Sequence, residues 1–375
     1  IDSTQGSVAF NGPVNAQAID VQAASGIDVQ STVTGTSLLL NSGAGNLTAG
    51  NAAGLISTID GIMLTGGGIA LASDSQVNSA GGLLVTSASG DIALGMVDSG
   101  GWATFDSAGN LALNNNVISA DDLDIDAVAA VYVAANTLIS SGGNFDLDAG
   151  SLTMGSGSLV RSDNAARMNT TGSMAVASID SGASLALQSG ADMLLGGDIA
   201  AVEQIILDAT GKLMLADQAS ITAGAAVAIN ANALEMGSGS SLDAAGQVSI
   251  ATLGDMQLAA LQTGWDGSDA FRLVSGGKIA GRADTATHLR TSAENAQSTL
   301  SAVTGIGDPL VVDVPWLAAE TLNGDINIVA ERGLYSPFLR ARNGDIKLRV
   351  NGSLTFGELI GNPYLWVDGA IDGDL

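Results

Sequence analysis

Apolar residues along this chain fall in short alternating pairs that recur about every twenty residues. Each pair has the form apolar–x–apolar and follows a glycine or another small residue. From Ile92 to Met256 the steps between successive pairs are 19, 20, 21 and 22 residues, and then the same four steps again. Alternation over a few positions is the period of a β-strand, and the Gly, Asn, Ser and Asp between the pairs favour turns. The pattern predicts short strands with no helix between them.

Residues 92–255 form one 82-residue block written twice, as 92–173 and 174–255. The clearest match is SLTMGSGS at 151–158 against ALEMGSGS at 233–240. A fixed period of this kind marks a solenoid, in which each coil contacts only its neighbours. Short strands can stack coil upon coil at ~4.8 Å, as they do in a parallel β-helix. We therefore predict an all-β chain folded as a single parallel β-helix.

The third copy of the block departs from the pattern after Gly264. Four extra residues place 265–269 in a loop that leaves its coil. From 284 to 305 the alternation disappears, and apolar residues are spaced by three or four positions, which is the helical period. The pattern predicts either an amphipathic helix on the flank of the solenoid or, alternatively, a long polar loop. The expected organisation is coils over 1–282, an excursion over 283–322 and further coils over 323–375.

Composition agrees with a solenoid and restricts the partners. The chain has 50 Gly and 5 Pro among 375 residues, and its apolar fraction of 46% argues against disorder. The net charge of −26 argues against nucleic acid and anionic membrane surfaces as partners. There is no Cys, and no apolar run approaches the ~18 residues that span a bilayer. Because the chain begins at Ile1, we interpret it as a mature or internal fragment.

The repeated coils resemble those of filamentous haemagglutinin-type exoproteins, large bacterial surface or biofilm-matrix adhesins exported by two-partner secretion. The resemblance lies in Gly-Asp-Ile-x-Leu at 90–94 and 344–348, Gly-Asn-Leu-x-Leu at 109–113 and Gly-Lys-Leu-x-Leu at 211–215. It implies a right-handed β-helix and export through an outer-membrane secretion partner. It also implies an adhesive shaft that binds polysaccharide, host molecules or sister cells. The secretion domain of that family is not recognisable here.

One candidate site is a ladder of carboxylates on neighbouring strands. With Leu123 and Ile125 pointing inward, Asp124 and Asp126 point outward, and Asp146 and Asp148 lie one coil further on. Stacked carboxylates repel each other unless a hard cation such as Ca²⁺ bridges them through oxygen ligands. The alternative is a solvated acidic face screened by salt. No other cofactor is indicated.

Two tryptophans are candidate sugar-binding platforms. Alignment of the two blocks places Trp102 opposite the outward Ser184, so its indole should face solvent with Thr104 and Asp106 beside it. The second platform is Trp265 on its inserted loop, between Asp266 and Asp269. The alternative for each is an indole that packs under a neighbouring loop or is merely exposed.

Two further functions remain open, and neither is favoured by a motif. A β-helical polysaccharide-degrading enzyme would need paired carboxylates in a groove, whereas a passive spacer would need no site at all. His288, the only histidine, lies on the expected helix, and we expect it on the surface rather than in a catalytic site. The chain is therefore expected to be a secreted adhesive rod and not an enzyme.

Overall fold

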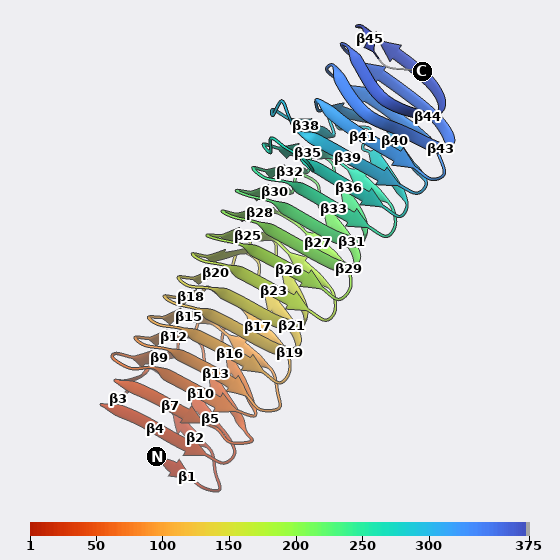
Figure 1. Ribbon diagram of the computed structural model, residues 1–375. Helices are drawn as coiled ribbons and strands as arrows, with labels where there is room; N and C mark the ends of the chain where they lie inside the picture. Colours follow the sequence, from red (N-terminus) through yellow and green to blue (C-terminus); the bar gives the residue numbers. More distant parts are fainter. Residues whose placement is uncertain (373–375) are drawn as a thin grey trace. The chain divides into compact units, whose positions relative to one another are not determined.

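The structure, a computed structural model, describes residues 1–372 as an all-β protein with 63% of residues in strands and no helix in that range. The strands form a parallel β-solenoid of about 19 turns with roughly 20 residues in each coil (Figure 1). The chain divides into two compact units, Ile1–Ala183 and Ser184–Leu375. The predicted parallel β-helix is confirmed.

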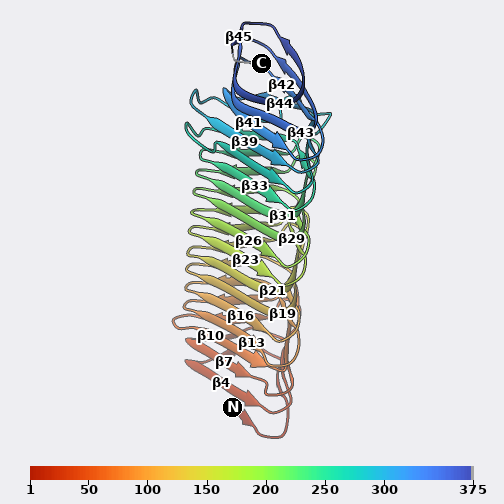
Figure 2. The same ribbon diagram turned by 45° about the vertical axis from the view of Figure 1, so that its right-hand side comes forward.

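The strands of the first unit stack in register into three parallel columns, called here faces 1, 2 and 3 (Figure 2). Face 1 comprises β1 (Asp2–Ser3), β4 (Ala18–Ala23), β7 (Ser37–Asn41), β10 (Ile62–Gly66), β13 (Leu83–Ser87), β16 (Ala103–Ser107), the start of β19 (Leu123–Val133) and β21 (Phe145–Met154), and β23 (Ala166–Thr170). Face 2 comprises β2 (Val8–Phe10), β5 (Ile27–Val29), β8 (Asn46–Ala49), β11 (Gly68–Leu71), β14 (Ile92–Leu94), β17 (Leu111–Leu113), the ends of β19 and β21, and β24 (Met174–Val176). Face 3 comprises β3 (Val14–Asn15), β6 (Val33–Gly35), β9 (Gly54–Ser57), β12 (Gln76–Ser79), β15 (Met96–Ser99), β18 (Val117–Ser119), β20 (Leu138–Ser141), β22 (Leu159–Ser162) and β25 (Ser178–Ser181).

The second unit repeats the three columns, and several of its strands continue around a corner from one face to the next. Face 1 comprises β26 (Leu185–Ser189), β29 (Ile205–Leu215), β31 (Val227–Met236), β33 (Val248–Thr252), β36 (Phe271–Ser275), β39 (Gln297–Ala302), β41 (Trp316–Thr321), β43 (Leu334–Val350), β44 (Leu354–Val367) and β45 (Ile371–Asp372). Face 2 comprises the ends of β29, β31, β43 and β44, with β27 (Met193–Leu195), β34 (Met256–Leu258), β37 (Lys278–Gly281), β40 (Gly305–Asp313) and β42 (Ile326–Ala330). Face 3 comprises β28 (Asp198–Ala201), β30 (Ser220–Ala223), β32 (Ser241–Ala244), β35 (Ala260–Thr263) and β38 (Leu289–Thr291), which pairs with the end of β40.

Inward side chains stack on like side chains from coil to coil. Phe105 of β16 is fully buried and lies in register with Ile125, which is followed by Leu147 and Met168 in the next two coils. Burying an aliphatic or aromatic side chain of this size is worth ~1.5–3 kcal/mol. Because side chains alternate along a strand, this inward column also fixes which residues form the outward columns of face 1.

The repeated Gly-Asp and Gly-Asn pairs join one coil to the next. The Asp91 carboxylate accepts a hydrogen bond from the Asn110 backbone N–H, 19 residues later, at 2.7 Å. A Cβ at Gly109 would lie 2.3 Å from that same oxygen, so the carboxylate occupies the space that a side chain there would need. The arrangement recurs where Asp192 accepts from Lys212 N–H and where Asp255 accepts from Lys278 N–H, both at 2.8 Å. The motif is thus a contact between coils.

The amphipathic helix predicted over 284–305 is wrong. The segment contains β38 and β39 and ends where β40 begins at Gly305. Thr291 and Ser298 point inward and are buried, as Leu289 and Leu300 are. These buried residues alternate with more exposed neighbours along β38 and β39. Counting only apolar residues therefore hid the strand period, because small hydroxyl residues occupy inward positions. No helix within residues 1–372 is long and apolar enough to cross a membrane.

Candidate functional site: a tryptophan and a carboxylate ladder on face 1

Trp102 lies immediately before β16, and its indole lies flat against the preceding coil. A Cβ built at Gly82 would be 2.4 Å from Cε2 and 2.7 Å from Nε1 of this indole, so only a glycine leaves room for the ring. The Trp102 carbonyl accepts hydrogen bonds from Ser99 Oγ at 3.0 Å and from Leu83 N–H at 2.9 Å. The side chain stays 47% exposed. The indole is therefore held from beneath while its outer face is open to solvent.

The outward residues of the next strands continue from Trp102 in two rows. Thr104 pairs in register with Asp124, Asp124 with Asp146, and Asp146 with Arg167. The second row runs from Asp106 through Asp126 and Asp148 to Asn169. Neighbouring strands in such a sheet lie ~4.8 Å apart. The structure thus brings together Trp102, Thr104 and Asp106 with the carboxylate ladder, here defined as Asp124, Asp126, Asp146 and Asp148.

Arg167 supplies positive charge to one end of the ladder. Its guanidinium donates to Asp146 Oδ1 at 2.5 Å and to both oxygens of Asp148, at 2.9 Å and 3.1 Å. Asn169 Nδ2 also donates to Asp148, at 2.8 Å. The hydrogen bonds from Arg167, with that from Asn169, lower the pKa of Asp148, and the same contacts raise the pKa of Arg167. Asp148 is therefore held as a carboxylate.

The two ladder residues farther from Arg167 behave in the opposite way. Burial, followed by the charges of Asp126, Asp146 and Asp148, raises the pKa of Asp124. Burial, followed by the neighbouring carboxylates of Asp148, Asp106 and Asp146, raises the pKa of Asp126. One end of the ladder is thus neutralised by a guanidinium, while the end beside Trp102 carries repelling carboxylates that favour a hydrogen-bonded or cationic neighbour.

Two grooves open on these outward rows. The larger is called here the Trp102 groove; it has a volume of about 430 Å³ and is lined by Trp102, Thr104, Asp122, Asp124, Asn144 and Asp146. The smaller, of about 300 Å³, is lined by residues that include Asp106, Asp126, Asp148 and Asn169. The Asp122 carboxylate accepts from Asn144 N–H at 2.7 Å. Asp124, which pairs in register with Thr104, accepts no hydrogen bond from another side chain among residues 1–372.

The calcium hypothesis for the ladder finds no support in the geometry. Across residues 1–372, no group of three or more His, Cys, Asp or Glu side chains is placed to hold a metal ion. The four carboxylates lie side by side on a flat strand surface, and such a surface does not surround a cation with six to eight oxygens. Arg167 provides the countercharge that the hypothesis assigned to Ca²⁺.

The second tryptophan is integrated into its own loop. Trp265 is 41% exposed, and its Nε1 donates to the Ser268 carbonyl at 3.0 Å. The Asp266 carboxylate accepts from both Asn295 N–H, at 2.7 Å, and Asn295 Nδ2, at 3.1 Å, which ties the loop to the next coil. Asp269 turns the chain with a φ of 57°. These contacts give Asp266 and Asp269 structural roles in the loop that carries Trp265.

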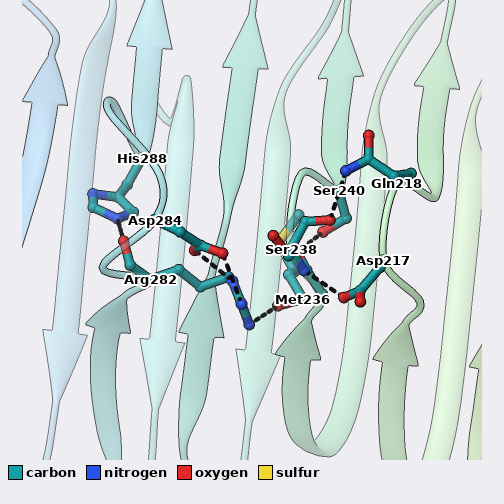
Figure 3. Close-up of polar contacts among 9 residues, drawn as sticks. Asp217, Gln218, Met236, Ser238, Ser240, Arg282, Asp284 and His288 are labelled. Atoms are coloured by element: carbon teal, nitrogen blue, oxygen red, sulfur yellow. Dashed lines mark hydrogen bonds and ion pairs between the residues drawn. The ribbon is translucent and has the colours of Figure 1, made fainter.

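A polar cluster that sequence reasoning missed lies around Arg282 (Figure 3). Arg282 donates to the Met236 carbonyl at 3.0 Å and to both oxygens of Asp284, at 2.9 Å and 3.0 Å. Hydrogen bonds from Arg282 and then from Ser238 lower the pKa of Asp284 to about 2. These contacts fasten the loop after β37 onto an earlier coil.

His288 is buried in this cluster, so the expectation of a surface histidine was wrong. It is 2% exposed, and its Nδ1 accepts from Val311 N–H at 3.0 Å. Nε2 must then carry the proton, and it donates to the Arg282 carbonyl at 2.9 Å. A Cβ at Gly281 would lie 2.4 Å from the imidazole. A glycine before a seven-residue loop that ends in histidine was the available signal.

The candidate site is therefore the Trp102 groove with the carboxylate ladder beside it, a surface suited to hydrogen bonding and ring stacking. Comparison with protein-family models, with curated proteins and with solved structures gives no match for this chain.

Proposed function

We propose that this chain is part of a secreted or cell-surface bacterial adhesin of the filamentous haemagglutinin-like type, and that it attaches to polysaccharide through the Trp102 groove. The parallel β-solenoid and the Gly-Asp-Ile-x-Leu coils support the first part. Export through an outer-membrane secretion partner belongs to the same proposal.

The observation that carries the binding proposal is the seating of Trp102 on Gly82. A flat, exposed indole offers a π face to the C–H side of a sugar ring, and its packing over Gly82 limits the orientations that it loses on binding. The groove volume of about 430 Å³ lies within the range of small-ligand sites. Its lining of Thr104, Asp122 and Asp124 provides acceptors for sugar hydroxyls. The carboxylates favour neutral or cationic sugars and disfavour uronates.

A glycan array probed with the full chain tests this proposal. Trp102→Ala should abolish or weaken by about tenfold the binding of neutral or amino sugars, which corresponds to ~1.4 kcal/mol. Gly82→Ala should weaken it too, because the added methyl displaces the indole. Trp265→Ala and Gly12→Ala serve as controls, since a Cβ at Gly12 meets no atom within 4 Å. Equal binding by the parent and Trp102→Ala would contradict the proposal, and absence of binding by every form would favour a passive spacer.

One observation favours a second candidate, polysaccharide hydrolysis. Asp126 and Asp148 are register partners whose pKa values are moved in opposite directions, as in pairs that divide acid and base roles. Against it, Arg167 and Asn169 occupy both oxygens of Asp148. A reducing-end assay on the polysaccharides bound in the array, with Asp126→Asn as the comparison, separates an enzyme from a binder.

A further inference from the structure

Four outward side chains near the end of the second unit form a surface that the Trp102 proposal does not use. Lys347 and Arg349 lie on β43, and Tyr364 and Trp366 lie on the neighbouring β44 (Figure 2). The strands are in register, so Lys347 pairs with Tyr364 and Arg349 pairs with Trp366. These four residues are called here the cationic–aromatic patch.

The core determines that these side chains face outward. Ile346, Leu348 and Val350 are buried and alternate with Lys347 and Arg349, which are exposed. Tyr364 is 62% exposed and Trp366 is 70% exposed. Strand geometry then places the Cα of each cationic residue ~4.8 Å from that of its aromatic partner on the next strand, and ~6.6 Å from the Cα of the other cationic residue along the strand.

The charge of the patch is not neutralised from within the protein. Several other bases in this unit are paired, for example Arg332 with Asp313 at 2.7 Å and Lys278 with Asp308 at 2.5 Å. Arg349 has no ion pair with any residue in the range 1–372 that the structure describes. Lys347 reaches Asp325 only at 3.8 Å, with both side chains about half exposed, and such a pair contributes little. In a chain of net charge −26, two exposed cations beside two exposed rings are an exception.

We propose that the cationic–aromatic patch binds an acidic polysaccharide built of uronic acids. The planar guanidinium of Arg349 matches a carboxylate in two parallel hydrogen bonds, and Lys347 provides a second point charge one strand repeat away. The rings of Tyr364 and Trp366, on the strand beside the two cations, offer faces on which sugar rings stack. Each sugar of a uronate chain carries one ring and one carboxylate, and the patch pairs one aromatic ring with one cation at each of two positions along the strands. A nucleic acid fits less well, because its dense phosphates are repelled by the net charge.

Titration of the full chain with polygalacturonate by biolayer interferometry, at low salt and at 0.15 M salt, tests this inference. We expect binding that weakens with salt, and about tenfold weaker binding by both Arg349→Gln and Trp366→Ala. The matched control is Arg272→Gln, which removes the same charge from an exposed arginine flanked in register by Ser249 and Thr299 rather than by aromatic rings. Trp102→Ala should leave this binding unchanged, so the two sites fail or succeed separately. Circular dichroism melts verify that each variant is folded.

The nature of the ligand is tested with three further polymers. Fully methyl-esterified polygalacturonate should not bind, because its carboxylates are neutral. Dextran sulfate and single-stranded DNA should bind more weakly than polygalacturonate at equal charge. The inference is overturned if polygalacturonate fails to bind at low salt, if Trp366→Ala binds like the parent, or if Arg272→Gln loses as much affinity as Arg349→Gln. Tighter binding of DNA or dextran sulfate would also overturn it, by showing a general polyanion surface.

Discussion

The contact between Asp91 and Gly109 makes a prediction about how neighbouring coils are held together. Gly109→Ala places a methyl group where Asp91 Oδ1 now lies, 2.3 Å from the new Cβ. The carboxylate must leave, and the Asn110 N–H then loses an acceptor at 2.7 Å. The backbone at Gly109 is not in the left-handed region, so the substitution introduces no strain of that kind.

The size of the effect follows from two contributions. A hydrogen bond to a charged acceptor is worth ~1.5–3 kcal/mol, and the exposure of Asp91 selects the lower end. Replacing glycine with alanine stabilises by ~0.4–1 kcal/mol through the unfolded chain. Gly109→Ala should therefore destabilise the coil by ~1 kcal/mol net, whereas Asp91→Ala loses the hydrogen bonds from Asn110 N–H and, at 3.2 Å, from Asn110 Nδ2 without that compensation, at ~1.5 kcal/mol. In the double variant the new methyl group occupies the space that the Asp91 carboxylate has left. Adding the second substitution to the first should therefore change the free energy of unfolding by almost nothing, although the new Cβ still lies only 3.1 Å from the Gly90 carbonyl oxygen.

Hydrogen exchange of the Asn110 amide is the appropriate assay, because a solenoid opens locally and a single melting temperature does not describe it. Exchange should be about fivefold faster in Gly109→Ala and about tenfold faster in Asp91→Ala, and the double variant should exchange no faster than Asp91→Ala, with ~1.4 kcal/mol per tenfold. Gly12→Ala controls for the loss of a glycine, since nothing lies within 4 Å of its Cβ. Additive effects of the two substitutions would refute the reasoning, because the carboxylate would then not be what excludes the methyl group.

Three further predictions concern charge and burial. Arg167→Gln should return the pKa of Asp148 towards its ordinary value in an NMR titration. A depressed pKa stabilises the folded chain at pH values above the pKa of the unfolded chain, and this stabilisation is lost as the pH falls through the pKa of the folded chain. The variant should therefore be less stable than the parent at pH 7 and equally stable in acid. Asp124→Asn should stabilise the first unit at pH 7 by ~0.3–1 kcal/mol in urea titrations, reduced by solvent screening. That gain should vanish at low pH, where the raised pKa leaves the parent carboxyl protonated; a gain that persists would contradict it. His288→Phe leaves Val311 N–H without its acceptor and should speed exchange of that amide about tenfold, whereas unchanged exchange would show that the imidazole contributes nothing.

The sequence was sufficient to predict the fold because every coil makes the same contacts with its neighbours. Those contacts require the same types of residue at the same spacing. Alignment of the two 82-residue blocks placed Phe105 inward and Trp102 outward, and both are so in the structure. The same parity placed Asp124 and Asp126 on the surface. What alignment could not predict was Arg167 as their partner, because only the exact register of β21 and β23 brings the arginine onto Asp146 and Asp148.

The error over 284–305 has a chemical cause. Inward positions near the corners of the coils are filled by serine and threonine. Many of these hydroxyls donate to backbone carbonyls, as Ser119 Oγ does to Gly101 and Asp122 at 2.8 Å and 3.0 Å, whereas Ser298 Oγ is buried without a hydrogen bond among the described residues. A hydrophobic count treats these buried hydroxyls as surface residues and loses the strand period wherever they cluster. Scoring small hydroxyl residues as inward would restore the alternation at Thr291 and Ser298.

The two aromatic surfaces differ in a way that follows from the same rule of strand parity. Beside Trp102 on face 1 of the first unit, the residues that flank the apolar inward column are Thr and Asp, so Trp102 lies among acceptors. On β43 and β44 the outward positions carry Lys, Arg and aromatic residues. A stacked coil can change every outward residue without disturbing the inward column, and outward charge is therefore free to vary from coil to coil. The two proposals together assign neutral or cationic sugars to the carboxylates around Trp102 and uronates to the cations beside Trp366. Trp102→Ala and Trp366→Ala should each weaken the binding of one class about tenfold or more and spare the other.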